Sequence, residues 1–118
     1  MDSQGGNSCV FCRIVSGKAG ASLLHADDHV VAFPDIAPKA PTHVLVVPRR
    51  HVASVLDVPS HDGIVARLAQ VACAIARKGG LDKGGFRLVL NTGADGGQSV
   101  FHLHLHLLGG RAMAWPPG

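Results

Sequence analysis

Residues 102–108 read His-Leu-His-Leu-His-Leu-Leu, so three histidines alternate with single leucines. This alternation is typical of a β-strand, because successive side chains of a strand point to opposite faces. His102, His104 and His106 then share one face, and the leucines share the other. We therefore expect the leucine face to pack into a core and the histidine face to line a site.

The spacing of the histidines limits what the row can do. Neighbouring histidines on a strand lie roughly 6.6 Å apart at Cα, and the outer two lie about 13 Å apart. One zinc ion, with Zn–N distances near 2.0 Å, can take two adjacent rings but hardly all three. A solvated polar face or a two-histidine chelate is one interpretation. The other is a row in which one imidazole is a nucleophile and its neighbours hold a phosphate.

The segment that leads into this row is rich in glycine. Residues 91–99 read Asn-Thr-Gly-Ala-Asp-Gly-Gly-Gln-Ser. Glycines let backbone N–H groups approach an anion, and Asn91, Gln98 and Ser99 offer side-chain hydrogen bonds. Such a loop is often only a turn between strands. Next to three histidines, we favour a phosphate-binding loop.

Length and composition indicate a single small domain. The 118 residues carry a net charge of +3, with one Trp and no Tyr, and the basic residues are scattered. A nucleic-acid-binding surface is therefore not expected, because its stacking residues and basic stripe are missing. No apolar run approaches 18 residues and no signal-peptide pattern is present, so we expect a cytoplasmic protein with no membrane segment. We expect a disordered tail over residues 1–8 and one domain over residues 9–118.

The hydrophobic pattern predicts one main helix after Ser60. Its apolar residues recur at the spacing of an amphipathic helix, at Ile64, Leu68, Val71, Ala72 and Ile75. Ser60 is expected to cap the start of this helix, and Gly79 and Gly80 are expected to end it.

Shorter apolar segments predict the remaining elements. A short helix is expected at residues 11–15, and strands are expected at residues 23–25, 29–33, 43–47, 86–90 and 101–108. The strand at 43–47 is apolar almost throughout, so we expect it to be central. The predicted fold class is α+β, with an antiparallel sheet of about five strands and the main helix packed on one face.

The three cysteines are an odd number, which argues against a disulfide framework. Cys9 and Cys12 have the spacing of a metal-binding or redox pair, whereas Cys73 lies on the apolar face of the main helix. Two ordinary thiols near the start of the chain are the simpler interpretation of the pair. The alternative is a zinc site, which needs two further nitrogen or sulfur ligands.

Taken together, these motifs resemble the histidine-triad (HIT) superfamily of nucleotide hydrolases and transferases. The likeness continues through residues 32–38, Ala-Phe-Pro-Asp-Ile-Ala-Pro, and 41–48, Pro-Thr-His-Val-Leu-Val-Val-Pro. The segment 109–118, Gly-Gly-Arg-Ala-Met-Ala-Trp-Pro-Pro-Gly, is similar to the histidine-triad nucleotide-binding (HINT) branch, the purine nucleoside phosphoramidases. This resemblance covers the chain from Cys9 onward. It implies a HIT-like fold and a homodimer whose two sheets join edge to edge, with the C-terminal segment reaching the partner's site.

The resemblance also implies roles for individual residues. His104 would be the nucleophile that forms a nucleotidyl-histidine, His106 would bind the α-phosphate, and His102 and His43 would complete the histidine set. Ser99 would contact the phosphate or help to protonate the leaving amine. The nucleotide pocket would be lined by Phe11, Phe33, Asp35, Ile36, Asn91, Gly97 and Gln98, with Asp35 accepting from the ribose hydroxyls.

Zinc-containing members of the superfamily combine a Cys-x-x-Cys pair with a histidine after the third strand and the first histidine of the triad. The matching residues here are Cys9, Cys12, His51 and His102. The HINT branch commonly lacks the cysteines, so this chain combines features of two branches. We expect any zinc to be structural, with no cofactor needed for catalysis.

The implied function is hydrolysis of the P–N bond of purine nucleoside 5′-phosphoramidates, such as adenosine 5′-phosphoramidate or lysyl-AMP. AMP and GMP are then the expected nucleotide ligands. One alternative is a dinucleoside polyphosphate hydrolase or nucleotidyltransferase of the same superfamily. Transferases there carry glutamine in place of the third histidine, so His106 favours hydrolysis. The other alternative is a nucleotide-binding interaction module.

Overall fold

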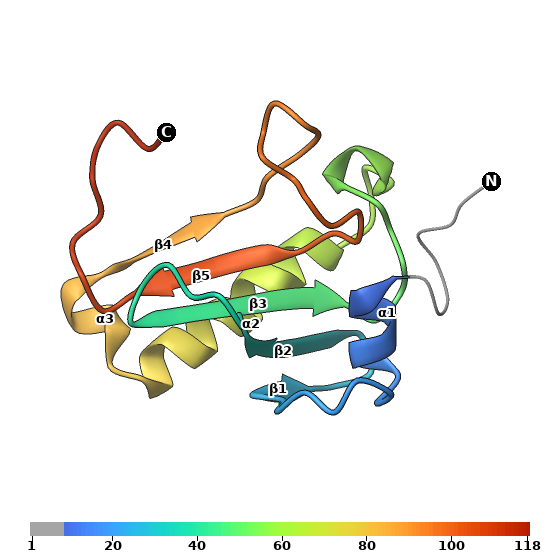
Figure 1. The fold of residues 1–118 in the computed structure, drawn as a ribbon, viewed down its shortest axis with the longest axis horizontal. Helices are drawn as coiled ribbons and strands as arrows, with labels where there is room; N and C mark the ends of the chain where they lie inside the picture. The colour runs from blue at the N-terminus through green and yellow to red at the C-terminus, as the bar shows by residue number, and fades with distance from the viewer. Residues whose placement is uncertain (1–8) are drawn as a thin grey trace.

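A five-stranded antiparallel sheet organises residues 9–118, the part of the chain that the computed structural model describes (Figure 1). The expected tail over residues 1–8 lies outside these residues. The strand order is β1-β2-β3-β5-β4, which places β3 in the middle, as its apolar sequence predicted. The strands are β1 (His25–Ala26), β2 (Val30–Pro34), β3 (Thr42–Pro48), β4 (Phe86–Val89) and β5 (Leu105–Gly109).

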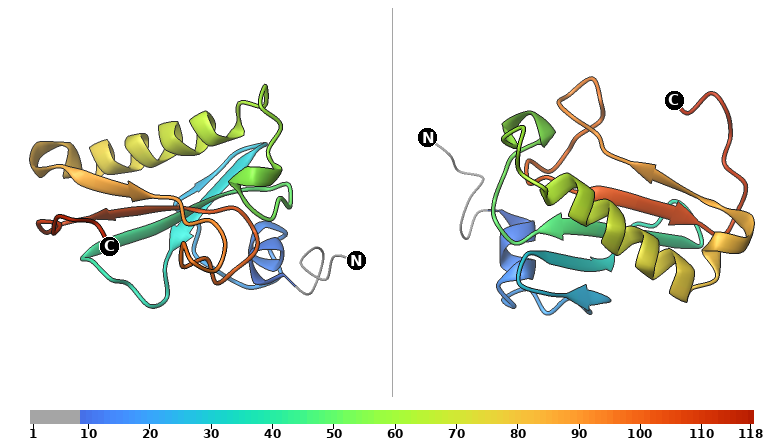
Figure 2. Two further views of the ribbon diagram at one scale, coloured as in Figure 1. Left: turned by 90° about the horizontal axis from the view of Figure 1, so that it is seen from above. Right: turned by 180° about the vertical axis from the view of Figure 1, so that it is seen from behind.

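The helices lie on both sides of this sheet. The main helix, α2 (Ile64–Lys78), covers one face, and α1 (Val10–Val15) lies on the other side at one end of the strands (Figure 2). The short elements η2 (Val55–Asp57) and α3 (Leu81–Gly84) flank α2 in the chain. Within residues 9–118, every helix is too short or too polar to cross a bilayer.

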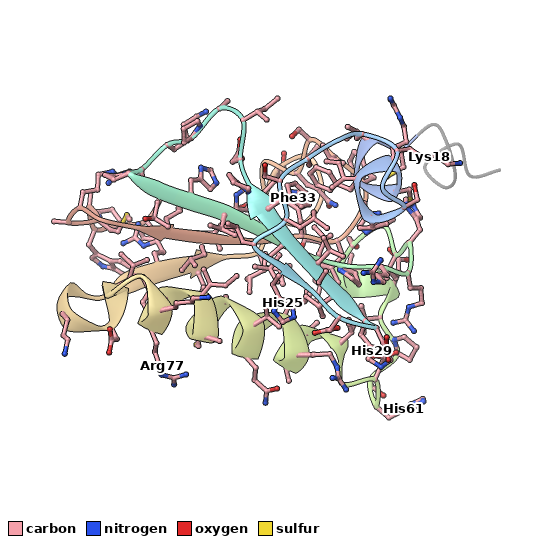
Figure 3. All side chains as sticks on the ribbon, turned by 90° about the horizontal axis from the view of Figure 1, so that it is seen from below. Lys18, His25, His29, Phe33, His61 and Arg77 are labelled. Atoms are coloured by element: carbon pink, nitrogen blue, oxygen red, sulfur yellow. The ribbon has the colours of Figure 1, made fainter. Side chains whose placement is uncertain are left out.

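Alternation along the strands divides the core into two parts. Val44 and Val46 of β3 face α2, together with Leu103, Leu105 and Leu107, and Leu107 is fully buried. The predicted burial of the leucine face is therefore confirmed. The other face carries a smaller core, formed by Cys9, Phe11, Val31, Phe33, Leu45 and Val47. Figure 3 shows Phe33 on the side of the sheet away from α2, and Arg77 pointing outward from the far side of that helix.

The strand predicted for residues 101–108 begins later than expected, at Leu105. Pairing between β3 and β5 ends at Val46 and Leu105. Before Leu105 the chain contacts the segment that follows β3. The N–H of Leu103 donates to the carbonyl of Val52 at 2.7 Å. The alternation of faces nevertheless continues, because Leu103 remains in the core against α2. The other strands and the short helix shift by at most two residues from their predicted bounds.

The predicted cap of the main helix is also wrong, because α2 begins at Ile64 and not directly after Ser60. Asp62 accepts the backbone N–H of Ile64 at 2.9 Å through Oδ1 and the guanidinium of Arg50 at 2.9 Å through Oδ2. The N–H of Asp62 in turn donates to the carbonyl of Pro59, so Ser60 lies inside a turn. The hydrogen bonds from Arg50 and from Ile64 lower the pKa of Asp62. The predicted end of the helix at Gly79 is confirmed.

This correction gives a matched pair of variants. Asp62→Ala removes the acceptor for a backbone N–H at the helix start, so we expect the Tm to fall by about 4 °C. Ser60→Ala is expected to leave the Tm unchanged, because no helix N–H depends on its hydroxyl. Thermal unfolding followed by circular dichroism compares the two. If the two variants have equal Tm values, Asp62 does not stabilise the start of α2.

Candidate functional site

A cavity of about 320 Å³ opens on the face of the sheet that α2 leaves uncovered. Phe11 from α1 and Phe33 from β2 supply apolar walls, while His104 and His106 supply imidazoles. Five of the residues expected in a nucleotide pocket line this cavity together with the two histidines: Phe11, Phe33, Asp35, Ile36 and Ser99. Segments far apart in sequence therefore meet at one place.

Three residues expected in the pocket are not among those that line this cavity, namely Asn91, Gly97 and Gln98. The buried amide of Gln98 instead holds its own loop together and ties it to the segment that follows β3. Its oxygen accepts the N–H of Gly93 at 2.9 Å, and its nitrogen donates to the carbonyls of Ala53 at 2.7 Å and Val100 at 3.1 Å. Gln98 thus fixes the loop that presents Ser99 to the cavity.

His104 is oriented by a backbone carbonyl. Its Nδ1 lies 2.8 Å from the carbonyl oxygen of His102. Because a carbonyl can only accept, Nδ1 carries the proton and Nε2 holds the lone pair. Burial lowers the pKa of His104, so the ring is neutral near pH 7. A neutral, buried imidazole with an available lone pair beside a cavity is suited to nucleophilic attack.

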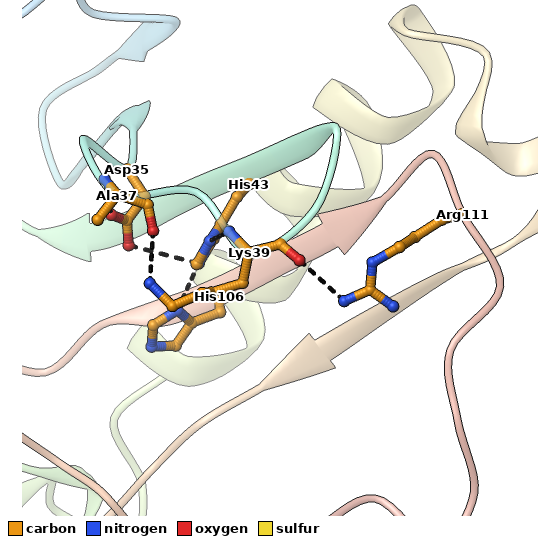
Figure 4. A network of polar contacts seen from close by, with 6 residues as sticks. All are labelled: Asp35, Ala37, Lys39, His43, His106 and Arg111. Carbon is orange, nitrogen blue, oxygen red and sulfur yellow. Dashed lines mark hydrogen bonds and ion pairs between the residues drawn. The ribbon is translucent and has the colours of Figure 1, made fainter.

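A chain of hydrogen bonds determines which nitrogen of His106 carries its proton (Figure 4). The backbone N–H of Lys39 donates to Nδ1 of His43 at 3.0 Å, so in the neutral ring the proton of His43 resides on Nε2. That nitrogen lies 2.9 Å from Nδ1 of His106 and donates to it. The proton of His106 is thereby left on Nε2, which is buried and has no hydrogen-bond partner among residues 9–118. His106 offers a donor that a phosphate oxygen can accept.

Three further contacts hold this chain of hydrogen bonds in place. Arg111 donates to the carbonyl of Lys39 at 2.8 Å, and the ammonium group of Lys39 donates to the carbonyl of Ala37 at 2.8 Å. The carboxylate of Asp35 lies 3.4 Å from Nε2 of His43. The sequence contains no signal for the role of Lys39, because its backbone N–H, and not its side chain, acts on His43.

Burial keeps the imidazoles of the site uncharged. It is the main cause that lowers the pKa of His106 to about 4, with smaller contributions from the nearby His104 and His43. Burial also lowers the pKa of His43, against the opposing effect of Asp35. The two rings are therefore neutral hydrogen-bonding groups at pH 7 rather than a pair of cations.

A pH dependence of stability follows from these pKa shifts. Unfolded His106 titrates near pH 6.5 and folded His106 near pH 4, so the unfolded state binds more protons between these values. The free energy of unfolding therefore falls as the pH decreases from 6.5 to 4. Urea unfolding of His106→Gln should show a shallower pH slope than wild type, by up to about 1.4 kcal/mol per pH unit. His61→Gln, at an exposed position, serves as the control, and an unchanged slope in His106→Gln would contradict the shift.

The cysteine pair meets two histidines at the end of the sheet. Ligand atoms of Cys9, Cys12, His51 and His102 all lie within 4.8 Å of one another. Sγ of Cys12 lies 3.2 Å from Nδ1 of His51 and 3.5 Å from Nδ1 of His102, and Sγ of Cys9 also lies 3.5 Å from the latter. A tetrahedral zinc ion with ordinary Zn–S and Zn–N bonds separates sulfur and nitrogen ligands by about 3.5 Å. These four residues fit such an ion.

The second nitrogen of His102 supports the same conclusion. Nε2 of His102 lies 2.8 Å from the carbonyl oxygen of Pro48 and donates to it, which leaves the lone pair on Nδ1, facing the thiols. Burial lowers the pKa of His102 to about 4, so the ring is available as a neutral ligand. His102 does not line the cavity. Its contribution to the cavity is its carbonyl, which orients His104.

A second group of possible metal ligands lies at the cavity itself. Atoms of Asp35, His43 and His106 also lie within 4.8 Å of one another. In this group the ring nitrogens that face each other already share a hydrogen bond. The thiol-containing group is therefore the better candidate metal site among residues 9–118.

Comparisons with known proteins agree with this geometry. The HIT domain family matches residues 16–113. A purine nucleoside phosphoramidase of Escherichia coli is 41% identical over 105 residues, covering 88% of each chain. The crystal structure of a HIT family hydrolase from Legionella pneumophila has a TM-score of 0.90 and 46% identity, covering 93% of this chain and 99% of its own. A zinc-bound histidine triad family protein from Mycobacterium smegmatis has a TM-score of 0.81 and 39% identity, over 91% of this chain and 78% of its own.

Proposed function

The chain belongs to the HIT domain family and is a hydrolase, and from this premise we propose that it cleaves the P–N bond of purine nucleoside 5′-phosphoramidates. The observation that carries the proposal is the pairing of two neutral imidazoles in one cavity. His104 has its Nε2 lone pair available, and His106 has a buried Nε2–H to which the described part of the chain offers no acceptor. One group can attack phosphorus while the other binds a phosphoryl oxygen.

In the first step, Nε2 of His104 attacks the α-phosphorus, and the P–N bond to the amine breaks as the new N–P bond forms. The departing nitrogen takes up a proton, supplied by the Ser99 hydroxyl or by solvent, and leaves as an amine. The ring of His104 keeps its Nδ1 proton and becomes positively charged, so its hydrogen bond to the carbonyl of His102 strengthens. A charged imidazole on phosphorus is also a good leaving group, which prepares the second step.

In the second step, water attacks the phosphorus of the nucleotidyl-histidine. The N–P bond breaks, the attacking water gives up one proton to solvent or to Ser99 and so replaces the proton used in the first step, the nucleoside monophosphate leaves, and His104 returns to its neutral form. In both steps the Nε2–H of His106 donates to a phosphoryl oxygen, where negative charge is stabilised in the transition state. Ser99 lines the same cavity. In this proposal it contacts the phosphate or the departing amine.

The nucleoside occupies the apolar part of the cavity in this proposal. Phe11 and Phe33 contact each other edge to face, with ring centroids 5.5 Å apart, and form one wall. The side chain of Ile36 is fully exposed at the rim, where a bound base or ribose would cover it. Asp35 accepts the N–H of Ala37 at 2.8 Å through Oδ1 and has further lone pairs for the ribose hydroxyls. AMP and GMP are the nucleotides we expect to bind.

Steady-state assays with several substrates test this proposal. We expect adenosine 5′-phosphoramidate and lysyl-AMP to be hydrolysed with a higher kcat/KM than diadenosine polyphosphates. We also expect added magnesium to leave kcat unchanged, because the two histidines and Ser99 supply every role given above. Faster cleavage of the dinucleotides would favour a dinucleoside polyphosphate hydrolase. AMP binding without turnover of either class would favour an interaction module.

Two further parts of the proposal concern a structural metal ion and the oligomeric state. Zinc bound by Cys9, Cys12, His51 and His102 would tie α1 to the end of the sheet and would supply no catalytic chemistry.

We also infer a homodimer, in which two sheets continue across one edge. Among the described strands, β4 is an edge strand that pairs only with β5. Trp115, which is 81% exposed, would then lie near the partner's cavity and affect which amine fits.

A further inference from the structure

Helix α1 contributes to two sites at once. Cys9 at its N-terminus and Cys12 within its first turn belong to the group of metal ligands. Val10, Phe11 and Ile14 of the same helix line the nucleotide cavity. A helix of six residues has little room to move one set of side chains without the other.

The ring of Phe11 contacts both one of the candidate metal ligands, His102, and the proposed nucleophile, His104. Its centroid is 6.0 Å from that of His102 and 5.1 Å from that of His104, and both contacts are edge to face. Phe11 is buried in the smaller core, with 7% of its surface exposed. A shift of α1 would therefore move a wall of the cavity and a neighbour of His104 together.

The position of α1 depends on its tertiary contacts. Helices shorter than about 12 residues are marginal in water, so packing or ligands must stabilise this one. The contacts of α1 beyond its own segment include the packing of Phe11 and a hydrogen bond from Arg49 to the carbonyl of Val15, at 3.0 Å. A metal ion held by Cys9, Cys12 and two histidines of other segments would add the strongest restraint.

We propose that zinc binding and nucleotide binding are thermodynamically coupled, with Phe11 of α1 carrying the coupling, so that each ligand raises the affinity for the other. This inference rests on the proposed nucleotide function and on the proposed zinc site. Zinc fixes α1 in the position that the nucleotide needs, and the nucleotide packs against Phe11 and fixes the helix that carries two zinc ligands. Linkage requires the two effects to be equal. We expect a factor of about ten, within the usual range for coupled sites.

Two titrations on the full chain test the coupling. Calorimetry gives the Kd of AMP for the zinc-loaded and the metal-free protein, after circular dichroism has shown that the metal-free protein is folded. Competition with a chromophoric chelator gives the zinc affinity with and without saturating AMP. We expect AMP to bind about tenfold more tightly to the loaded protein and to raise the zinc affinity by the same factor. If the metal-free protein is unfolded, slower zinc release to the chelator in the presence of AMP is the supporting result.

Three outcomes would overturn the inference in distinguishable ways. In the first outcome, AMP binds tightly but changes neither the zinc affinity nor the rate of zinc release. This would overturn the coupling and leave the proposed function intact. Failure of AMP to bind the loaded protein would overturn the function and the coupling together. Absence of specific zinc binding would overturn the zinc site and the coupling, with the nucleotide function untouched.

A variant of Phe11 tests the route of the coupling. Phe11→Leu keeps all four metal ligands and an apolar side chain but removes the ring that contacts both His102 and His104. We expect AMP to change the zinc affinity of this variant by a clearly smaller factor than it changes the zinc affinity of wild type. Cys73→Ser, on α2, is the matched control and should keep the full coupling factor. Equal coupling in Phe11→Leu and wild type would overturn the role of Phe11.

Discussion

Replacement of His104 by asparagine is expected to lower kcat/KM for adenosine 5′-phosphoramidate by at least about a thousandfold, because the reaction loses its nucleophile. Asparagine keeps a side-chain N–H that can donate to the carbonyl of His102, so the local hydrogen bond need not be lost. It has no nitrogen lone pair for attack on phosphorus. Single-turnover assays measure the loss directly, and intact AMP binding would show that the cavity is preserved.

His61 provides the control for this variant. It is an exposed histidine just before α2, outside the cavity, so His61→Asn should retain wild-type kcat/KM. Trapping of a labelled nucleotide on the protein during turnover is expected in wild type and absent in His104→Asn. Substantial turnover by His104→Asn would contradict the assignment of the nucleophile and would favour direct attack by water.

Loss of zinc is the second large effect that we expect. Cys12→Ser replaces a thiolate ligand by a hydroxyl, a much poorer partner for zinc, so the purified variant should contain little metal. A site saturated about 100-fold above its Kd stabilises the folded state by about 2.7 kcal/mol. For a domain of this size, removal of the metal should lower the Tm by about 10 °C. Chelation of the wild-type protein should lower its Tm by a similar amount.

Elemental analysis and thermal unfolding check this expectation together. Cys73→Ser is the matched control, because Cys73 is a half-buried thiol of α2 outside the ligand group. It should keep one zinc ion per chain and a Tm close to that of wild type. Equal zinc content in Cys12→Ser and wild type would rule out the proposed site. Loss of zinc without any change in Tm would show that the metal does not stabilise the fold.

The sequence alone determined which residues face the core. The leucines between the histidines and the apolar stripe of α2 were predicted to be buried, and both lie in the core between α2 and the sheet. Periodicity predicts these faces because side-chain direction follows from local backbone geometry. The local geometry of a strand or helix does not depend on which segment packs against it. The α+β fold class and the central position of β3 followed from the same patterns.

The candidate site was predictable in part. A motif resemblance predicted one set of ligands, formed by Cys9, Cys12, His51 and His102. The structure brings the same four residues together. The cap of α2 and the start of β5 were missed. Both are fixed by hydrogen bonds, to Asp62 in one case and to Val52 in the other, and side-chain patterns do not record which backbone groups will meet.

Only the tertiary structure decided how the imidazoles are protonated. The N–H of Lys39 sets the tautomer of His43, His43 sets that of His106, and the carbonyl of His102 sets that of His104. These partners come from the loop before β3, from β3 itself and from the segment before β5. Residue type determines that a histidine can attack or donate, but its surroundings determine which nitrogen does so. The sequence therefore supplied the reactive groups, and the packing of distant backbone atoms against them gave each group its role.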